Sequence, residues 1–175
     1  HEFFACQNLT YVEIPGTVTT VGKGAFDKCE KLEIVKLSEG IEDLGAFAFG
    51  SCHSLKEVRI PASIKDFGEW KDKGRWFAEC RNLESIVIEE GSTAIAPYAF
   101  ASIRSKFKIT IPESVKEIGK GAFEGCSGIV KVRPVSKGEE AAAGEIGIPE
   151  HIKVISEHEF FACQNLTYVE IPGTV

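Results

Sequence analysis

Short segments of alternating apolar and polar residues recur along the chain. In residues 10–14, Val12 and Ile14 would face one side and Tyr11 and Glu13 the other, because successive side chains of a strand point to opposite faces. Proline closes most of these segments, and it stops a strand ladder because it has no N–H group. Each segment therefore predicts a short strand, and stacked copies predict a parallel sheet.

Two further pieces complete each unit. Val18 and Val21 predict a second extended segment that ends at Gly22, a position where glycine recurs, which indicates a backbone site hostile to a Cβ atom. Phe26 and Cys29 are three residues apart, so one or two helical turns would bury both. The recurring glycines are Gly22, Gly45, Gly68 and Gly119.

The unit repeats with a period near 23 residues, which predicts a solenoid. No unit of this size can bury its own apolar face, so stacked units form the core together. The phenylalanines that mark the units are Phe3, Phe26, Phe49, Phe77, Phe100, Phe123 and Phe160. Three residues after each stand Cys6, Cys29, Cys52, Cys80, Ile103, Cys126 and Cys163.

The two ends of the chain carry one identical string. Residues 1–18 and 158–175 both read HEFFACQNLTYVEIPGTV, an offset of 157 residues. Identity at exposed positions indicates a recent duplication or the reuse of one segment, and we expect the chain to be one period of a longer array. The end units should then expose apolar residues such as Phe3, Val12, Val169 and Ile171.

The repeat A-F-x-x-C-x-x-L-x-x-V-x-I-P resembles the leucine-rich repeats of the BspA-like type, found in many bacterial and some protist surface proteins. The resemblance covers nearly the whole chain, as six full repeats and a partial one in a single domain of residues 1–175. It implies a right-handed α/β solenoid with short parallel strands and short helices, about 23 residues per turn. The chain departs from it at insertions near 69–76 and 134–147, and at Ile103 and Lys106.

The net charge and the distribution of apolar residues argue against several classes of function. The net charge is −6, whereas nucleic-acid binders usually carry a basic excess. No apolar stretch approaches the ~20 residues of a membrane-spanning helix, so we expect no membrane insertion within this segment.

The six cysteines share one repeat position, which predicts an inward-facing row of free thiols rather than a disulfide framework. Ile103 takes the same position in the fifth repeat, which is expected if the position requires only an apolar side chain that packs. We expect Cys29, Cys52 and Cys80 to be buried, unpaired and not bound to metal.

No catalytic constellation, metal-ligand spacing or phosphate-binding loop is present in the sequence. Acidic pairs such as Glu139-Glu140 are typical of solvated loops. The sequence therefore predicts a protein that is not an enzyme and needs no cofactor.

Candidate binding residues lie at outward strand positions and in the first insertion. Lys108, Lys131 and Arg133 form a basic cluster that could attract an acidic protein or an anionic glycan; a solvated strand face is the alternative. Trp70, flanked by basic residues, is typical of an interaction hot spot; a structural role is the alternative. Trp76 takes an alanine position of the repeat and should pack. The other candidates are Tyr11 and Tyr168.

The second insertion, from about Pro134 to Gly147, is small and polar and predicts a mobile excursion, after which Ile146 resumes the pattern. The family resemblance implies an extracellular or cell-surface module that binds a protein or glycan of a host or neighbouring cell. The alternative is a structural spacer or filament whose solenoids join end to end, which the identical termini favour.

Overall fold

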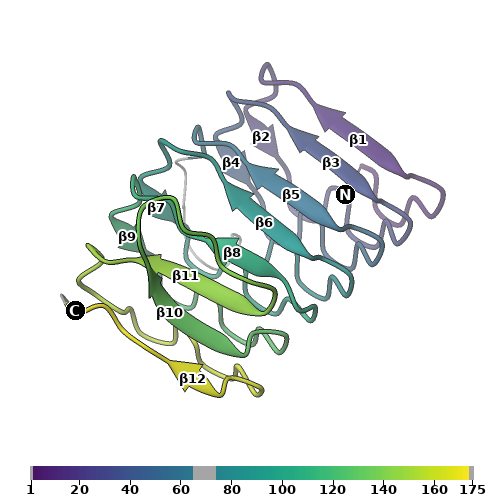
Figure 1. The fold of residues 1–175 in the computed structure, drawn as a ribbon. Helices are drawn as coiled ribbons and strands as arrows, with labels where there is room; N and C mark the ends of the chain where they lie inside the picture. The colour runs from purple at the N-terminus through teal and green to yellow at the C-terminus, as the bar shows by residue number, and fades with distance from the viewer. Residues whose placement is uncertain (1, 65–73, 174–175) are drawn as a thin grey trace.

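The computed structural model describes residues 2–64 and 74–173 and shows a stack of similar coils (Figure 1). Each coil contributes one strand to a parallel sheet that runs the length of the stack. The strands of this sheet are β1 (Tyr11–Ile14), β3 (Ile34–Leu37), β5 (Glu57–Ile60), β6 (Ser85–Ile88), β8 (Lys108–Thr110), β10 (Lys131–Val135), β11 (Glu145–Pro149) and β12 (Tyr168–Val169). Two smaller parallel sheets pair β2 (Thr20–Val21) with β4 (Asp43–Leu44) and β7 (Ala94–Ile95) with β9 (Glu117–Ile118).

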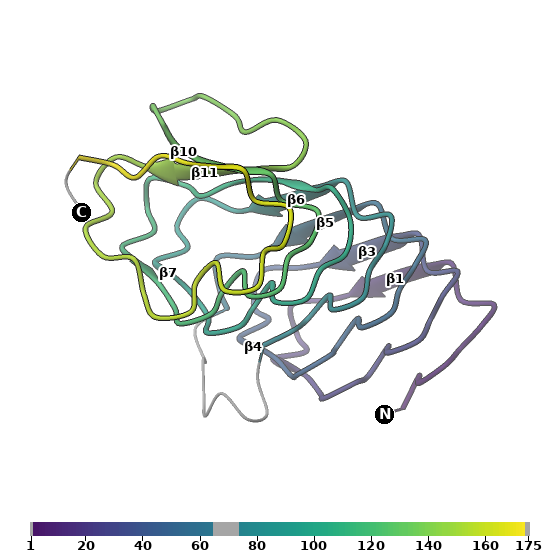
Figure 2. The same ribbon diagram turned by 90° about the horizontal axis from the view of Figure 1, so that it is seen from below.

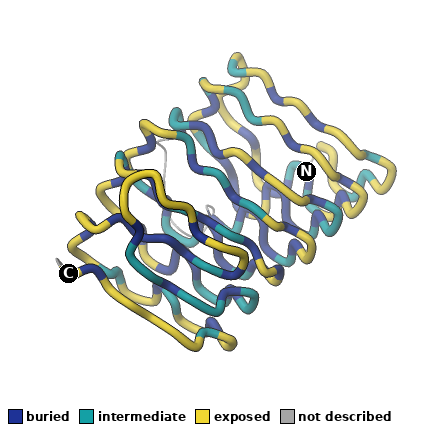
Figure 3. Tube along the Cα trace, in the orientation of Figure 1, coloured by how far each residue is buried: buried dark blue, intermediate teal, exposed yellow. Residues whose placement is uncertain are grey.

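The strands of the long sheet pair at equivalent repeat positions. Tyr11 lies beside Ile34, Ile34 beside Glu57, and Glu57 beside Ser85. Burial alternates along strands such as β5 and β6, as the sequence predicts (Figure 3). In β1, Val12 is buried and Tyr11 is exposed. The apolar side chains of all coils meet in one continuous core, which confirms the solenoid.

The predicted short helices do not form in the described residues. Around Phe26, alternate backbone N–H groups donate to the next coil instead: Gly24 to Ala46, Phe26 to Ala48 and Lys28 to Gly50, at 2.8–2.9 Å. The N–H groups between them close tight turns. A helix would need these amides for its own bonds, so the stacking of coils replaces it. Phe26 and Cys29 are nevertheless both buried, as the spacing predicts.

Among the described residues, this side of each coil from Phe26 onward contains two residues in the left-handed backbone region, and the first coil contains one, Ala5. They lie two residues before and two residues after the core phenylalanine, with φ between 51° and 69°. The turns they make reverse the backbone at short intervals, which interrupts any helix. Glycine fills few of these positions; the others are Ala5, Lys28, Phe47, Ser51, Arg75, Glu79, Tyr98, Ser102, His158 and Ala162.

The recurring glycine position is closed to a side chain where a preceding coil lies against it. A Cβ atom on Gly45 would come within 2.4 Å of the backbone N of Lys23, and one on Gly119 within 2.6 Å of the N of Pro97. Gly22, in the first coil, has nothing within 4 Å. The constraint therefore comes from the stacking of coils. Gly68 lies outside the described residues.

Trp76 fills the coil interface beside the first insertion. Its side chain is buried where other repeats carry alanine, and the indole N–H donates to the Leu44 carbonyl at 2.8 Å. The ring meets Phe100 edge-on at a centroid distance of 5.8 Å. The prediction that Trp76 packs is confirmed.

The second insertion differs from the predicted excursion. Strand β11 returns parallel to β10 and lies between β8 and β10, so the insertion adds a strand to the sheet. Residues 136–144, here called the crossing loop, pass over the outer face of the sheet (Figure 2). From β10 to β11 the chain moves back toward β8, and it crosses on the opposite face of the sheet from the other connections. Because both the direction and the face are reversed, the handedness of the crossover is unchanged.

The identical strings at the two ends differ in burial. Phe3, Val169 and Ile171 are exposed as expected, but Val12 is buried, so that part of the prediction was wrong. Val12 packs in the continuous apolar core, whereas Val169 on β12 lies outside it.

The left-handed positions predict a measurable backbone cost. A Cβ atom on Gly125 (φ 69°) would lie 3.6 Å from Ser102 Oγ, an ordinary contact, so Gly125→Ala should lower the free energy of unfolding by about 1 kcal/mol through backbone strain alone. The reverse change, Ala162→Gly (φ 57°), should raise it by a few tenths to about 1 kcal/mol. Urea unfolding measures both; a neutral Gly125→Ala would contradict the strain.

Candidate functional site

A groove runs along the outer face of the sheet, between the crossing loop and strands β5, β6 and β8. Its volume is about 1220 Å³, and it is open to solvent along the sheet. Such an open groove suits an extended chain better than a small, enclosed substrate. The outward side chains that form its floor are Glu57 and Arg59 of β5, Ser85 and Val87 of β6, and Lys108 and Thr110 of β8.

The crossing loop is fixed to the sheet and forms one wall of the groove. The Ala141 N–H donates to Thr110 Oγ1 at 2.8 Å, and the Ala141 side chain is buried over Gly147. A Cβ atom on Gly147 would come within 2.7 Å of Val135 on β10 and 3.5 Å of Ala141 Cβ, so this glycine leaves room for both side chains. The wall is therefore anchored by packing as well as by charge.

The three predicted cations lie at this wall, and each is paired with a glutamate of the second insertion. Lys108 Nζ is 3.0 Å from Glu140, and Lys131 Nζ is 3.8 Å from Glu145. Arg133 bonds Glu145 through Nε at 3.0 Å and Glu139 through Nη1 at 2.5 Å. The strand order also separates Lys108 from Lys131, because Glu145 on β11 lies between them.

The pairing changes the acidity of the groups involved. Hydrogen bonds to the Glu139 carboxylate, first from Arg133 and then from the Ser136 N–H, lower its pKa. Burial opposes the shift at Glu145, but bonds from the Ala142 N–H and Arg133 lower its pKa overall. Both side chains are therefore carboxylates at neutral pH, and they neutralise the cluster locally.

The remaining candidate residues do not join this site. Tyr11 and Tyr168 lie on β1 and β12, the two opposite edges of the eight-stranded sheet. Each tyrosine hydroxyl donates to a glutamate two residues on, and a lysine of a neighbouring coil lies over its ring, Lys36 for Tyr11 and Lys131 for Tyr168. Trp70 lies outside the described residues, and its role stays a prediction.

Sequence reasoning did not single out most of the groove floor. Arg59, Ser85 and Val87 occupy outward strand positions that the repeat pattern identifies, but nothing local marks them as a site. They become part of a groove because the crossing loop covers the neighbouring strands. The sequence feature that could have indicated the groove was the insertion after Arg133, because it forms a wall beside outward strand positions that are otherwise ordinary.

The row of thiols was the other candidate for chemistry. All six cysteines are free, and all but Cys6 are buried. Each buried thiol donates to the carbonyl of the phenylalanine in the preceding coil, as Cys52 does to Phe26 at 3.3 Å and Cys126 to Phe100 at 3.0 Å. Burial is the main cause that raises the pKa of the Cys80 thiol to about 12, and it raises the pKa of Cys52 and Cys126 as well. Thiols of this kind are poor nucleophiles and metal ligands.

Glu159 is the one buried carboxyl group among the described residues. Its Oε2 accepts the Ser156 N–H at 2.8 Å, while Oε1 is buried without a hydrogen-bond partner. Burial raises the pKa of this carboxyl to about 7. The equivalent residue of the identical string, Glu2, is exposed.

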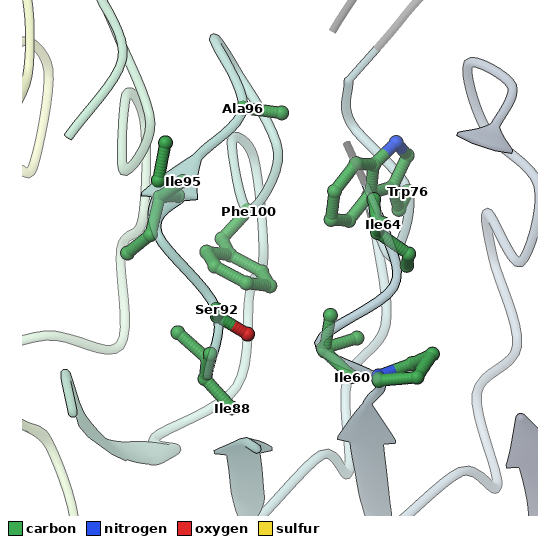
Figure 4. Close-up of a pocket in the computed structure, with 10 residues that line it drawn as sticks. Ile60, Ile64, Trp76, Ile88, Ser92, Ile95, Ala96 and Phe100 are labelled. Carbon is green, nitrogen blue, oxygen red and sulfur yellow. The ribbon is translucent and has the colours of Figure 1, made fainter. Parts of the chain in front are cut away.

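A small cavity lies inside the stack, between the coils on either side of the first insertion (Figure 4). Apolar residues such as Ile64, Trp76 and Phe100 line it, with Ser92 as a polar exception. Its volume of about 20 Å³ has room for one water molecule rather than a ligand.

Within residues 2–64 and 74–173, no cluster of three or more metal-ligating side chains is present. The same residues contain no helix long and apolar enough to cross a membrane.

Comparison with known families gives a match over most of the chain. A family model described as the BspA type leucine rich repeat region matches residues 1–130 and 139–175 in six copies. No match was found among curated proteins.

Several solved structures are similar to the chain, and three of them are leucine-rich proteins of bacteria. A leucine-rich repeat protein from Bacteroides ovatus is 28% identical, with a TM-score of 0.66; the match covers 93% of this chain and 40% of that protein. A leucine rich repeat protein from T. pallidum is 26% identical with a TM-score of 0.47, over 99% of this chain and 60% of that one. A leucine rich cell surface protein from Faecalibacterium prausnitzii is 17% identical with a TM-score of 0.33, over 94% and 79%. The last two likenesses are too weak to carry an argument.

The thiol row predicts a characteristic labelling pattern. In the native protein, Cys6 should react first with a thiol reagent and the five buried thiols far more slowly, because burial keeps them protonated. Unfolding should make all six react. Cys52→Ala should lower the free energy of unfolding by about 1 kcal/mol or a little more, as a small cavity in a packed stack does. Loss of free thiols after unfolding would refute the assignment.

The buried carboxyl group of Glu159 should make the free energy of unfolding fall as pH rises. Its pKa of about 7 in the fold lies above its ordinary value of 4.5, so the folded state holds the extra proton between these values. The free energy of unfolding should therefore decrease from about pH 4.5 to 7, and Glu159→Gln should remove that part of the decrease, a gain on the order of 3 kcal/mol above pH 7.

Glu2→Gln is the matched control, since Glu2 occupies the same string position in an exposed setting. Urea unfolding between pH 4 and 8 compares the two variants. Equal effects of the two changes would show that the Glu159 carboxyl is not buried in the fold.

Proposed function

Because the chain belongs to the family of BspA-type leucine-rich repeat proteins, we propose that it is a non-catalytic module that binds an extended protein or glycan chain outside the cell or on its surface. Leucine-rich repeat modules generally serve in binding. The chain spans 40% of the length of the Bacteroides ovatus relative, so this role concerns the module alone.

The observation that supports this role is the groove beneath the crossing loop. It is continuous with the outer face of the sheet, and its lining combines six glutamates with four basic residues around the apolar side chain of Val87. Mixed charges with a small apolar centre are typical of a surface that binds a polymer through several modest contacts. The outward positions supply these contacts without disturbing the core.

The chemistry of the interior supports binding rather than catalysis. The buried thiols are protonated, and their hydrogen bonds to backbone carbonyls hold them in the stack. Two cations of the groove are paired with carboxylates: Arg59 with Glu57 and Glu89, and Lys108 with Glu140. Such pairs can exchange partners at little cost, because exposed ion pairs contribute little to stability.

The net negative lining favours a partner that is neutral or basic where it lies in the groove. An acidic partner at Lys108, Lys131 and Arg133 remains a proposal, since such a partner would have to displace three glutamates. Tyr11, Tyr168 and Trp70 also remain candidate contacts, outside the groove as described.

Blocking the groove floor tests the proposal. Ser85→Trp should fill the groove at β6 and weaken binding of a ligand found on a panel of matrix proteins and glycans by about tenfold or more. Ile34→Trp is the matched control: Ile34 holds the same register column on β3 but does not line the groove. Titration of the ligand onto each variant measures the dissociation constants.

Equal weakening by both changes would show that the ligand binds elsewhere on the sheet. Absence of any ligand on the panel for the unmodified protein would count against the binding role itself. Circular dichroism of each variant checks that the fold is retained.

A further inference from the structure

The groove is charged unevenly across its width. On the wall side, the crossing loop and β8 carry lysines and glutamates close together, and Lys108 is already bonded to Glu140 at 3.0 Å. On the other side, β5, β6 and the residues that flank them contribute three carboxylates and one cation to the lining. These are Glu57, Glu84, Glu90 and Arg59. The half of the groove over β5 and β6 is therefore negative, and it would attract a basic partner.

Two of these carboxylates are available to a partner. The Arg59 guanidinium lies 3.5 Å from Glu57 and 3.1 Å from Glu89, so its charge is satisfied within the chain. Among the residues that the structure describes, the side chains of Glu84 and Glu90 form no ion pair or hydrogen bond. A basic side chain can therefore pair with either of them without displacing a group of the chain itself.

Glu84 and Glu90 stand at opposite ends of β6. Glu84 directly precedes Ser85, the first residue of the strand, and Glu90 comes two residues after Ile88, the last. The chain from one carboxylate to the other spans at most about 20 Å, because an extended chain rises about 3.3 Å per residue. Between them, the outward side chains of the floor are those of Ser85 and Val87, which carry no charge.

The end of the groove at Glu90 has a second carboxylate. Glu113 also lines the groove, one coil further on at the same repeat position. Its Oε2 is 3.1 Å from Nδ1 of His151, whose Nε2 is 2.7 Å from the Val115 carbonyl oxygen. Glu113 therefore adds negative charge beside Glu90 but is itself held by the histidine, which leaves Glu90 as the free carboxylate of this end.

The lysines of the groove without a partner lie on the opposite side, against the wall. Lys137 belongs to the crossing loop. The Lys106 side chain lies at the other end of that loop, where a Cβ atom on Gly144 would come within 2.8 Å of Lys106 Cε. These charges repel a basic partner from the wall, so such a partner should lie over β6.

The side chains of the lining favour a polypeptide over a glycan. Among the described residues that line the groove, none is aromatic, so it has no flat ring on which a sugar could stack. A polypeptide supplies its cations directly, as lysine or arginine side chains long enough to reach the carboxylates at both ends of β6.

Resting on the binding role proposed above, we propose that the partner is an extended polypeptide segment that lies along β6 and carries basic residues six positions apart. Successive side chains of an extended chain point to opposite faces, so the first and seventh residues of the segment face the same way. One then meets Glu84 and the other Glu90, while small or apolar residues between them cover Ser85 and Val87.

Short peptides with capped ends test the spacing. KSVSVSK carries lysines at its first and seventh positions, and KSVSVKS has the same composition with lysines on opposite faces. The first should bind about threefold tighter than the second, and the acidic peptide ESVSVSE should bind more weakly than either. Nuclear magnetic resonance titration of the 175-residue chain gives the dissociation constants, and the shifted amides should lie on β6. Added salt should weaken binding of KSVSVSK by screening the charges.

Removing the carboxylates tests their role. Glu84→Gln and Glu90→Gln should each weaken binding of KSVSVSK about twofold to fivefold, the effect of one exposed ion pair. The double variant should bind KSVSVSK and KSVSVKS equally, because the spacing then no longer matters. Glu117→Gln, on β9 and outside the groove, is the matched control for the change in net charge.

Equal binding of KSVSVSK and KSVSVKS to the unmodified protein would overturn the proposal, as would equal effects of Glu117→Gln and Glu84→Gln. A glycan or an acidic ligand whose binding is weakened by Ser85→Trp would overturn it too, but would leave the proposed binding role intact. Failure of all three peptides and of every ligand on the panel would overturn both.

Discussion

Hydrogen bonding between coils is the constraint on which the rest of this structure depends. On the strand side, the turn side and the return side, backbone amides find their partners in the neighbouring coil. A single coil could not satisfy these groups by itself, and an unpaired buried amide is costly. The stack is therefore the folding unit, and every coil must place its phenylalanine, thiol and glycine where its neighbours do.

The same constraint explains features that look unfavourable in isolation. Non-glycine residues occupy left-handed positions in nearly every coil, because only that backbone aligns alternate amides with the next coil. The thiols, which the row of cysteines brings together, form neither disulfides nor a reactive site. Each instead satisfies its S–H group on the coil before it, where burial keeps it protonated.

Function is expected where the regular pattern is interrupted. The second insertion places a strand inside the sheet and a loop over its outer face, and this loop turns ordinary outward positions into a groove. The groove supports the proposed binding role.

The sequence by itself determined the repeat, the inward and outward positions of the strands, the burial of Cys52 and the packing of Trp76. These follow from periodicity, which acts locally and identically in every coil. Only the tertiary structure decided that the turn side forms no helix, that β11 lies between β8 and β10, and that Glu145 separates Lys108 from Lys131. These outcomes depend on which neighbour a segment meets, and identical strings show it: Val12 is buried and Val169 is exposed because their surroundings differ.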